Sequence, residues 1–373
     1  MAGLLTFADF LKGTKTHKIT SATDILNEAV KQSYLLTLMI RGAMGAKVEM
    51  LQGGSKLKDS IQLKGTGSFR FYSPHGTHTP ADVDILTDIE TQWRFCVVSY
   101  AFADEVMDLN DESAMEDVWV RQKKKYEQGA MTDMYNGMEE ALLAVPVYAT
   151  MESGTGEDPP FYSLSAFINE ATNGVWPGWT NVETVNPSTE SRWRPQQVSY
   201  DSLNPTDETS GIIAGFDVLW AQMGFYPPEA GTQWFQAEDR GKLHFLTHLR
   251  GQVLYKRCLR ASNDSLITPQ DPAYNSPCYS GRPVHQITQL ATSALEITTQ
   301  TTATGSAWPA TKPRYIGLNT EFLYPIWHKG RFMEPVGPKD ISDQPFSQAM
   351  YRRTWGNLFC RSRQRQGILY PAA

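Results

Sequence analysis

Arginine is the residue type whose spacing in this chain most clearly suggests a binding surface. The last thirty positions contain five arginines and no acidic residue. Three of them, Arg361, Arg363 and Arg365, occupy every second position, so on a β-strand their side chains would share one side. With Arg352 and Arg353 this segment carries +5, and because the whole chain carries −6, the remainder carries about −11. This division of charge predicts a neighbour of opposite sign, namely another subunit, another part of the chain or nucleic acid, whereas a solvated basic strand edge is the alternative.

Other residues whose spacing could support chemistry give weaker patterns. His244 and His248 are four positions apart, as metal ligands on a helix can be, but Leu243–Thr247 has the composition of a buried strand and offers no third ligand. The chain contains neither a GxxxxGK[ST] phosphate-binding loop nor a GxSxG turn. We therefore expect no catalytic residue, no cofactor and no metal, and we expect that the chain is not an enzyme.

Composition indicates a well-packed protein with extensive contact surfaces. Hydrophobic residues make up 41% of the 373 positions, and the chain has 10 Trp, 16 Tyr and 16 Phe, a residue class enriched at protein interfaces as well as in cores. The four cysteines are scattered without CxxC spacing, which favours a reduced intracellular setting during folding. No secretory signal and no apolar run of eighteen residues is visible, so we expect no membrane association.

The first hundred residues suggest an arm and a long hairpin. Residues 1–45 begin with a mixed basic stretch and continue into a helix that ends near Gly42. Residues 46–102 contain a short alternating strand, a polar stretch rich in Gly and Pro, and a long strand from Thr91 to Phe102. Such a two-stranded arm cannot bury both faces by itself. We expect residues 52–84 to contribute few side chains to the core and to act in assembly.

A long helix and a small α/β unit follow the hairpin. From Ser113 to Leu143, apolar residues that include Trp119 recur at spacings of three and four, after an acidic start. At 1.5 Å per residue this helix is about 45 Å long. Beyond it the pattern predicts short helices, strands and loops, with these elements: helices at 164–171, 211–224 and 249–262, a strand at 243–247, a strand-prone stretch at 287–304, two short strands within 315–331, and a basic terminal strand.

This order of elements resembles the major capsid protein of tailed double-stranded DNA phages, the Hong Kong-type capsid fold. Three stretches are similar to that family: Asn181-Val-Glu-Thr-Val-Asn-Pro-Ser-Thr-Glu-Ser-Arg-Trp-Arg-Pro195, the segment beginning Ile316-Gly-Leu-Asn-Thr-Glu-Phe-Leu-Tyr324, and Gly356-Asn-Leu-Phe-Cys-Arg-Ser-Arg-Gln-Arg-Gln-Gly367. The resemblance covers nearly the whole chain. It implies an α+β fold with an N-terminal arm, an extended β-hairpin called the E-loop, a peripheral domain with a spine helix, and an apical α/β domain.

The resemblance also implies boundaries and partners. The expected division is an N-terminal arm and helix at 1–45, the E-loop at 46–102, the peripheral domain with its spine helix at 103–204, the apical domain at 205–290, peripheral strands at 291–340 and a C-terminal strand at 341–373. The expected partners are copies of the same chain in pentamers and hexamers, packaged DNA bound without sequence preference, and decoration, portal and scaffold proteins. The chain would then reside in the virion capsid, and in the host cytoplasm during assembly.

Candidate interface or DNA-facing residues follow from the same reasoning. Some family members crosslink an E-loop lysine to an asparagine of a neighbour, and Lys56, Lys58 and Lys64 are suitably placed, although no asparagine partner can be assigned. Trp119 and the five terminal arginines complete the set. Two other functions stay open: an encapsulin-like compartment, which shares the fold and would enclose a cargo protein, and a soluble α/β hydrolase-type enzyme, which would need a concave polar site that the sequence does not show.

Overall fold

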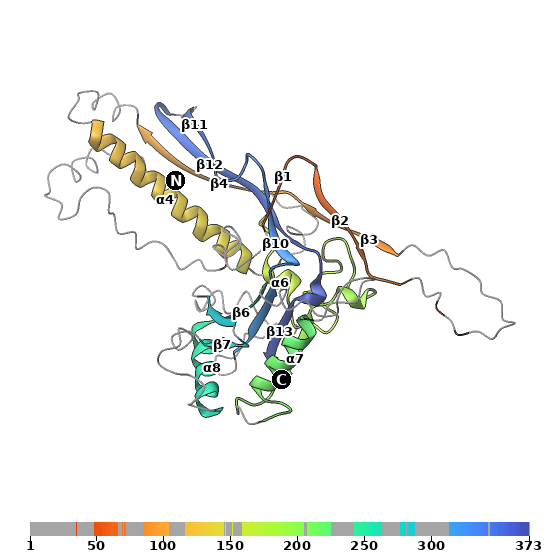
Figure 1. Cartoon of the computed structure of the whole chain (residues 1–373). Helices are drawn as coiled ribbons and strands as arrows, with labels where there is room; N and C mark the ends of the chain where they lie inside the picture. Colours follow the sequence, from red (N-terminus) through yellow and green to blue (C-terminus); the bar gives the residue numbers. More distant parts are fainter. Residues whose placement is uncertain are drawn as a thin grey trace.

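Two β-sheets and a long helix organise the part of the chain that the structure describes (Figure 1). In this computed structural model that part comprises residues 35, 48–65, 69, 71, 85–103, 116–144, 146, 151, 159–204, 207–224, 242–262, 277–280, 282–287, 313–341 and 344–372. The predicted N-terminal helix lies outside it apart from Leu35, and so do residues 288–304 of the strand-prone stretch.

The first sheet is built around one exceptionally long strand. Strand β12 (Gln344–Cys360) pairs antiparallel with β11 (Glu334–Ile341) and β10 (Leu323–His328) along one edge, and with β4 (Arg94–Ala103) along the other. A short strand, β1 (Glu49–Leu51), adds in parallel to β10. The two short strands predicted within 315–331 are present, as β10 in this sheet and β9 (Tyr315–Asn319) in the second sheet. Strand β11 falls almost entirely within the range 291–340 that was expected to contain peripheral strands.

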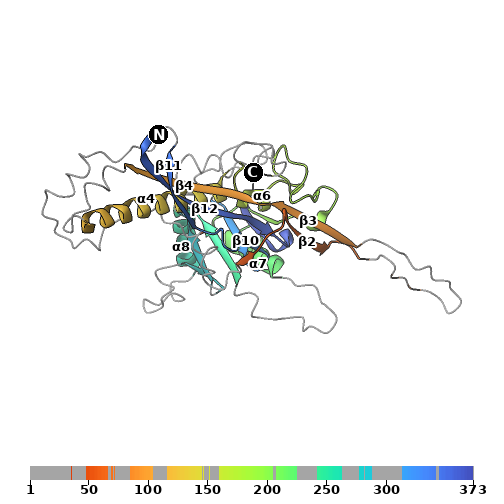
Figure 2. The ribbon, with the colours of Figure 1, turned by 90° about the horizontal axis from the view of Figure 1, so that it is seen from above.

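Helix α4 (Glu116–Leu143) is the predicted spine helix and runs beside this sheet (Figures 1 and 2). Its inner face meets the sheet through Tyr100 of β4 and Ala130, with Tyr126 and Met350 packed around them. The side chain of Trp119 lies outside the described part of the chain, so its predicted interface role stays a prediction.

The hairpin is present, but its strands differ from those expected. Its arms are β2 (Lys56–Gln62) and β3 (Leu86–Gln92), paired antiparallel from Lys56 with Gln92 to Gln62 with Leu86. The predicted single strand from Thr91 to Phe102 is wrong, because the pairing changes at Trp93, where β3 ends and β4 joins the first sheet. Gly53 and Gly54 have φ values of 82° and 86°, which glycine adopts readily, and they separate β1 from β2.

The second sheet gathers strands from distant parts of the sequence. Its strand order is β5–β13–β9–β6–β8–β7. The strands are β5 (Gln196–Tyr200), β6 (Leu243–Thr247), β7 (Cys278–Tyr279), β8 (Arg282–Gln286), β9 (Tyr315–Asn319) and β13 (Gly367–Pro371). A contiguous apical unit at 205–290 therefore omits β5, β9 and β13. The predicted helices over 211–224 and 249–262 are present as α7 (Ile212–Met223) and α8 (Leu249–Ser262).

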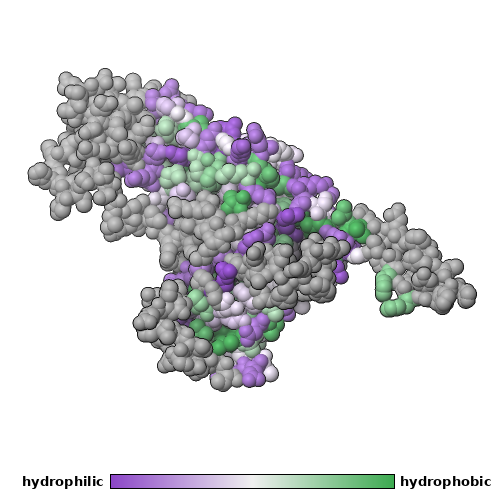
Figure 3. Space-filling view, in the orientation of Figure 1, coloured by the Kyte–Doolittle hydropathy of each residue, from purple (hydrophilic) through white to green (hydrophobic). Residues whose placement is uncertain are grey.

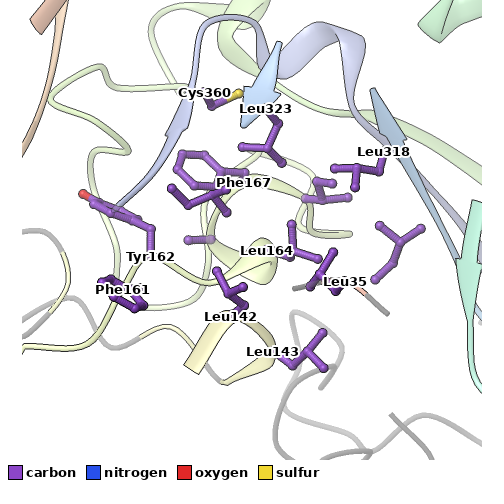
Figure 4. Close-up of a cluster of buried hydrophobic side chains, with 14 of the residues drawn as sticks. Leu35, Leu142, Leu143, Phe161, Tyr162, Leu164, Phe167, Leu318, Leu323 and Cys360 are labelled. Atoms are coloured by element: carbon purple, nitrogen blue, oxygen red, sulfur yellow. The ribbon is translucent and has the colours of Figure 1, made fainter. Parts of the chain in front are cut away.

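One hydrophobic core joins the two sheets (Figure 4). It receives Leu323 and Cys360 from the first sheet and Leu318 from the second, and α4 contributes Leu142. The short helix α6 (Leu164–Phe167) is fully buried between them. A second cluster fills the other face of the second sheet and includes Phe216 of α7, Phe245 of β6 and Tyr255 of α8. Both faces of the second sheet are thus covered.

The C-terminal segment is two strands rather than one. Strand β12 ends at Cys360, a 3-10 turn (η7, Arg363–Arg365) follows, and β13 then enters the second sheet. The predicted alternation of Arg361, Arg363 and Arg365 on one side of a strand is therefore wrong. The sequence period of two holds only while the chain stays extended, and here the chain turns to pass between sheets.

Candidate assembly surfaces

The two histidines that the sequence offered as metal ligands do not form a metal site with other described residues. No group of three or more His, Cys, Asp or Glu side chains in the described part could hold a metal ion. His248 is buried, and its Nδ1 accepts N–H groups of Arg250 and Gly251 at the start of α8. Burial lowers the pKa of His244 to about 4, so its imidazole is neutral at pH 7. These two histidines serve the fold of the second sheet rather than one shared site.

No described helix is both long enough and apolar enough to cross a membrane.

The hairpin lysines are exposed but already paired. Lys56 Nζ lies 2.9 Å from Glu90, and Lys58 Nζ lies 2.7 Å from Asp88 on the opposite strand. The hydrogen bond and charge of Asp88 raise the pKa of Lys58. Because cross-strand pairs of opposite charge stabilise a hairpin, the immediate role of these lysines is to hold β2 against β3.

The base of the hairpin is fixed to its own subunit. Lys64 Nζ lies 2.6 Å from Glu190, in the loop that the sequence analysis assigned to the capsid family. Leu57 and Leu63 are buried in a cluster with aromatic residues of the first sheet. The expectation that residues 52–84 contribute few core side chains is therefore wrong for their first part, because β2 runs directly over that cluster.

A buried carboxylate also connects the hairpin to the first sheet. Glu183 is fully buried and accepts hydrogen bonds from Thr91 Oγ1, at 2.9 Å, and from the Cys360 N–H, at 3.0 Å. Through these two hydrogen bonds Glu183 links the end of β3 to the end of β12. The hairpin consequently leaves the body in a direction set by its own subunit, and β2 and β3 point away from α4 (Figures 1 and 2).

Three of the five terminal arginines form ion pairs within the chain. Arg352 pairs with Glu127 of α4, and Arg353 Nε lies 2.7 Å from Glu334 of β11. Arg361 Nε lies 2.6 Å from Asp59 of the hairpin. These three cations satisfy acidic groups of the same chain, which was one of the alternatives that the charge division predicted.

Arg363 and Arg365 are buried, so their prediction as interface or DNA-facing residues is wrong. Arg363 is 0% exposed and donates to main-chain carbonyls, those of Ala166, Phe167, Gly174 and Trp193. Burial lowers the pKa of its guanidinium to about 10, which leaves it charged at pH 7. Arg365 is 7% exposed and lies with its guanidinium 5.9 Å from the centre of the Phe322 ring.

The outer face of the first sheet exposes hydrophobic side chains. On β4, Phe95 is 60% exposed and Val97 is 66% exposed. Phe95 packs edge-on against Trp355 of β12, with ring centroids 4.9 Å apart, and Arg331 lies 5.2 Å above the Trp355 ring. Figure 3 shows hydrophobic atoms over this sheet with hydrophilic atoms around them. Alternation along a strand puts Phe95 and Val97 on one face, and the structure shows that this face is exposed.

This architecture, an α+β body with a projecting hairpin, a spine helix and a second sheet, matches solved shell structures. No protein-family model and no curated protein matches the chain. Among solved structures, the chain is similar to the capsid of cyanophage A-1(L), with a TM-score of 0.62, 10% identity and coverage of 96% of this chain and 98% of that chain. It is also similar to the capsid of a native GTA particle, with a TM-score of 0.54, 12% identity and 97% coverage of both chains. The capsid of an empty GTA particle matches with a TM-score of 0.51, 11% identity and coverage of 94% and 99%.

The chain therefore has the fold of these capsid structures, and the expected Hong Kong-type α+β fold is confirmed. Identities of 10–12% with such coverage show a shared architecture, and a shared fold by itself does not show function.

Proposed function

We propose that this chain is a major capsid protein whose copies assemble, as pentamers and hexamers, into the icosahedral shell around the double-stranded DNA of a tailed phage. The observation that carries the proposal is the likeness of 96–97% of the chain to two capsid structures with TM-scores above 0.5. In this role the chain is a structural component of the virion rather than an enzyme. The hairpin β2–β3 is the E-loop, α4 is the spine helix of the peripheral domain, and the second sheet belongs to the apical domain.

The surfaces of the chain suit repeated contacts between copies. Phe95 and Val97 expose apolar area on the rigid first sheet, and paired charges surround them. An apolar centre with a charged rim is typical of protein interfaces. The hairpin leaves the body in a fixed direction, so a second copy meets it in a preset geometry, which lowers the entropy lost on association.

DNA contact within the shell is expected to depend on phosphate charge rather than on base sequence. The terminal arginines support this part of the proposal only weakly, because each of the five is paired or buried within the chain. Binding through phosphates weakens steeply with salt as counterions are released. A preference of more than about a hundredfold for one DNA sequence would contradict it, since no described element has the form of a groove-reading motif.

The direct test is the state of the purified chain. Sedimentation and negative-stain electron microscopy are expected to show closed shells with five-fold and six-fold clusters. Nuclease-protected DNA inside native particles supports the phage shell, whereas an enclosed cargo protein would support the encapsulin-like compartment instead. A chain that stays a 41.9 kDa monomer under all conditions, native particles included, would refute both.

A further inference from the structure

A two-residue turn in the loop after α6 has backbone angles that its residue types rarely adopt. Val182 and Val185 flank the turn and exchange two main-chain hydrogen bonds, of 2.9 and 3.2 Å. Between them, Glu183 has a φ of 51° and Thr184 has a φ of 70°. Two-residue turns with positive φ at both positions favour Asn and Gly, and a β-branched residue at positive φ is strained. Surrounding contacts must therefore hold this strained turn, Val182–Val185, in its conformation.

The hairpin supplies three of these contacts, all from β3. Thr91 Oγ1 donates to the carboxylate of Glu183 at 2.9 Å, and the Glu90 N–H donates to the main-chain carbonyl of Glu183 at 3.4 Å. In the other direction, Thr184 Oγ1 donates to the main-chain carbonyl of Asp88 at 3.2 Å. The bond from Thr91 is buried, whereas the bond from Thr184 is exposed. The strained turn and the hairpin are thus bonded directly to each other.

Other contacts attach the strained turn to the body of the subunit without involving the hairpin. The Cys360 N–H donates to the Glu183 carboxylate at 3.0 Å, and Trp193 Nε1 donates to the main-chain carbonyl of Val182 at 3.0 Å. The side chain of Val182 is buried in the core that joins the two sheets. These contacts stay in place when the hairpin moves, so the strained turn belongs to the body and holds the hairpin from there.

The two chain connections between the hairpin and the body do not by themselves fix an angle. One passes through Gly53 and Gly54, and glycine adopts many backbone conformations. The other passes through Trp93, where the pairing changes from β2 to β12. Trp93 Nε1 donates to the carbonyl of Gly54 at 3.0 Å, so the two connections lie side by side. Residues at the ends of strands are typical hinges, and beyond these the hairpin projects away from α4 (Figures 1 and 2).

The remaining contacts of the hairpin stabilise its attachment more than its angle. Ile89 is buried in the cluster that the hairpin shares with the first sheet, but hydrophobic burial is non-directional. The ion pairs of Lys64 with Glu190 and of Arg361 with Asp59 join partly exposed side chains, and such pairs contribute little. The hydrogen bonds to the strained turn, by contrast, have defined directions.

We propose that the strained turn is a releasable latch for the hairpin. Its hydrogen bonds to β3 hold the hairpin at one angle, and the hairpin leaves this angle when these bonds break and the backbone of the turn relaxes. Because release removes the strain at Thr184, the held and released states lie closer in free energy than the hydrogen bonds alone would place them. The inference rests on the proposed function only in its consequence, which is that one chain presents its hairpin to neighbouring copies at more than one angle.

The first experiment measures the angle of the hairpin in the full chain. Nitroxide labels are attached through an unnatural amino acid at Gln62, the end of β2, and at Lys329, which follows β10. Labelled chains are diluted with unlabelled chains, so that double electron–electron resonance reports the distance within one copy. We expect one narrow distance distribution in the wild type. Thr91→Val keeps the side-chain shape but removes the buried hydrogen bond, and should raise the population at other distances about tenfold.

Thr87→Val is the matched control for this substitution. Thr87 lies on the same strand and pairs with Ile61 of β2, away from the strained turn. We expect the Thr87→Val variant to keep the wild-type distribution. A broad distribution in the wild type, or a Thr91→Val variant that matches the wild type, would overturn the inference.

The second experiment tests whether strain opposes the latch. Thr184→Gly is added to Thr91→Val, because glycine adopts positive φ without strain. The population at other distances should then fall about threefold, although the exposed bond to Asp88 is also lost. An unstrained turn would instead be loosened by glycine, so an equal or larger population than in Thr91→Val would overturn the inference. Neither measurement requires a closed shell, so failure of the latch and failure of the proposed function are separate results.

Discussion

The two sheets differ in what their exposed and buried faces contain. In the second sheet every residue of β6, Leu243–Thr247, is buried, and aromatic residues of α7 and α8 cover one face. In the first sheet one face meets α4, whereas the other leaves Phe95 and Val97 largely exposed. The hydrophobic residues of the second sheet are thus buried when the subunit folds. Part of those of the first sheet stay exposed, where they do not stabilise an isolated subunit.

The difference suggests a division of labour within one chain. A sheet with both faces covered stabilises the subunit alone, since burial of apolar area is the main favourable term in folding. An apolar sheet face becomes favourable only when another surface covers it. We infer that the second sheet sets subunit stability and that the first sheet, with the hairpin, sets association. Substitutions should separate the two roles.

Matched phenylalanines provide the largest expected effect. Phe245 is 0% exposed and packs against the ring of Phe216 at 5.0 Å, so Phe245→Ala should destabilise the subunit by about 3–5 kcal/mol. Phe95→Ala removes an exposed ring and should cost less than about 1 kcal/mol of unfolding free energy. We expect Phe95→Ala to reduce the fraction of chains that assemble, although its subunit is nearly as stable as the wild type. Urea unfolding together with sedimentation measures both, and equal losses of stability in the two variants would remove the distinction.

Two neighbouring arginines should differ nearly as much. Arg363→Leu removes the guanidinium donor from the buried carbonyls of Phe167 and Trp193 and should cost about 2–4 kcal/mol, because each unsatisfied buried group is unfavourable. Arg361→Leu removes a partly exposed ion pair with Asp59 and should cost about 0–1 kcal/mol. Chemical denaturation of both variants gives the comparison. A small loss of unfolding free energy in Arg363→Leu would mean that this side chain does not stabilise the turn between β12 and β13.

Acidic pH should weaken the second sheet by a smaller amount. Burial lowers the pKa of both His244 and His285 to about 4, and their rings lie 6.0 Å apart on neighbouring strands. Because an unfolded histidine has a pKa of about 6.5, the unfolded state binds more protons between pH 6.5 and 4, and stability is lost as pH falls through that range. Between pH 7 and pH 5 each histidine should account for about 1–2 kcal/mol.

The pH effect is checked by urea unfolding at both pH values. His244→Leu should show a shallower fall in unfolding free energy than the wild type, because it removes one of the buried histidines whose pKa is lowered, a group that also includes His285 and His248. An unchanged slope in His244→Leu would show that this histidine does not titrate with unfolding.

Sequence reasoning predicted elements whose signal is local. The spine helix, α7, α8 and the buried strand β6 follow from periodicity and composition within each segment, and their order led to the fold. The strand break at Trp93 and the turn at Arg363 could not be predicted, because both depend on which distant strand offers hydrogen bonds.

The division of labour is tested most directly by hydrogen–deuterium exchange of free subunits and of assembled particles. We predict that amides of β4 from Phe95 to Ala103, and those of the hairpin, gain protection on assembly. Amides of β6, which are already buried in the subunit, should change little. If β4 exchanges equally in both states while β6 becomes protected, the first sheet is not the association surface and the account is contradicted.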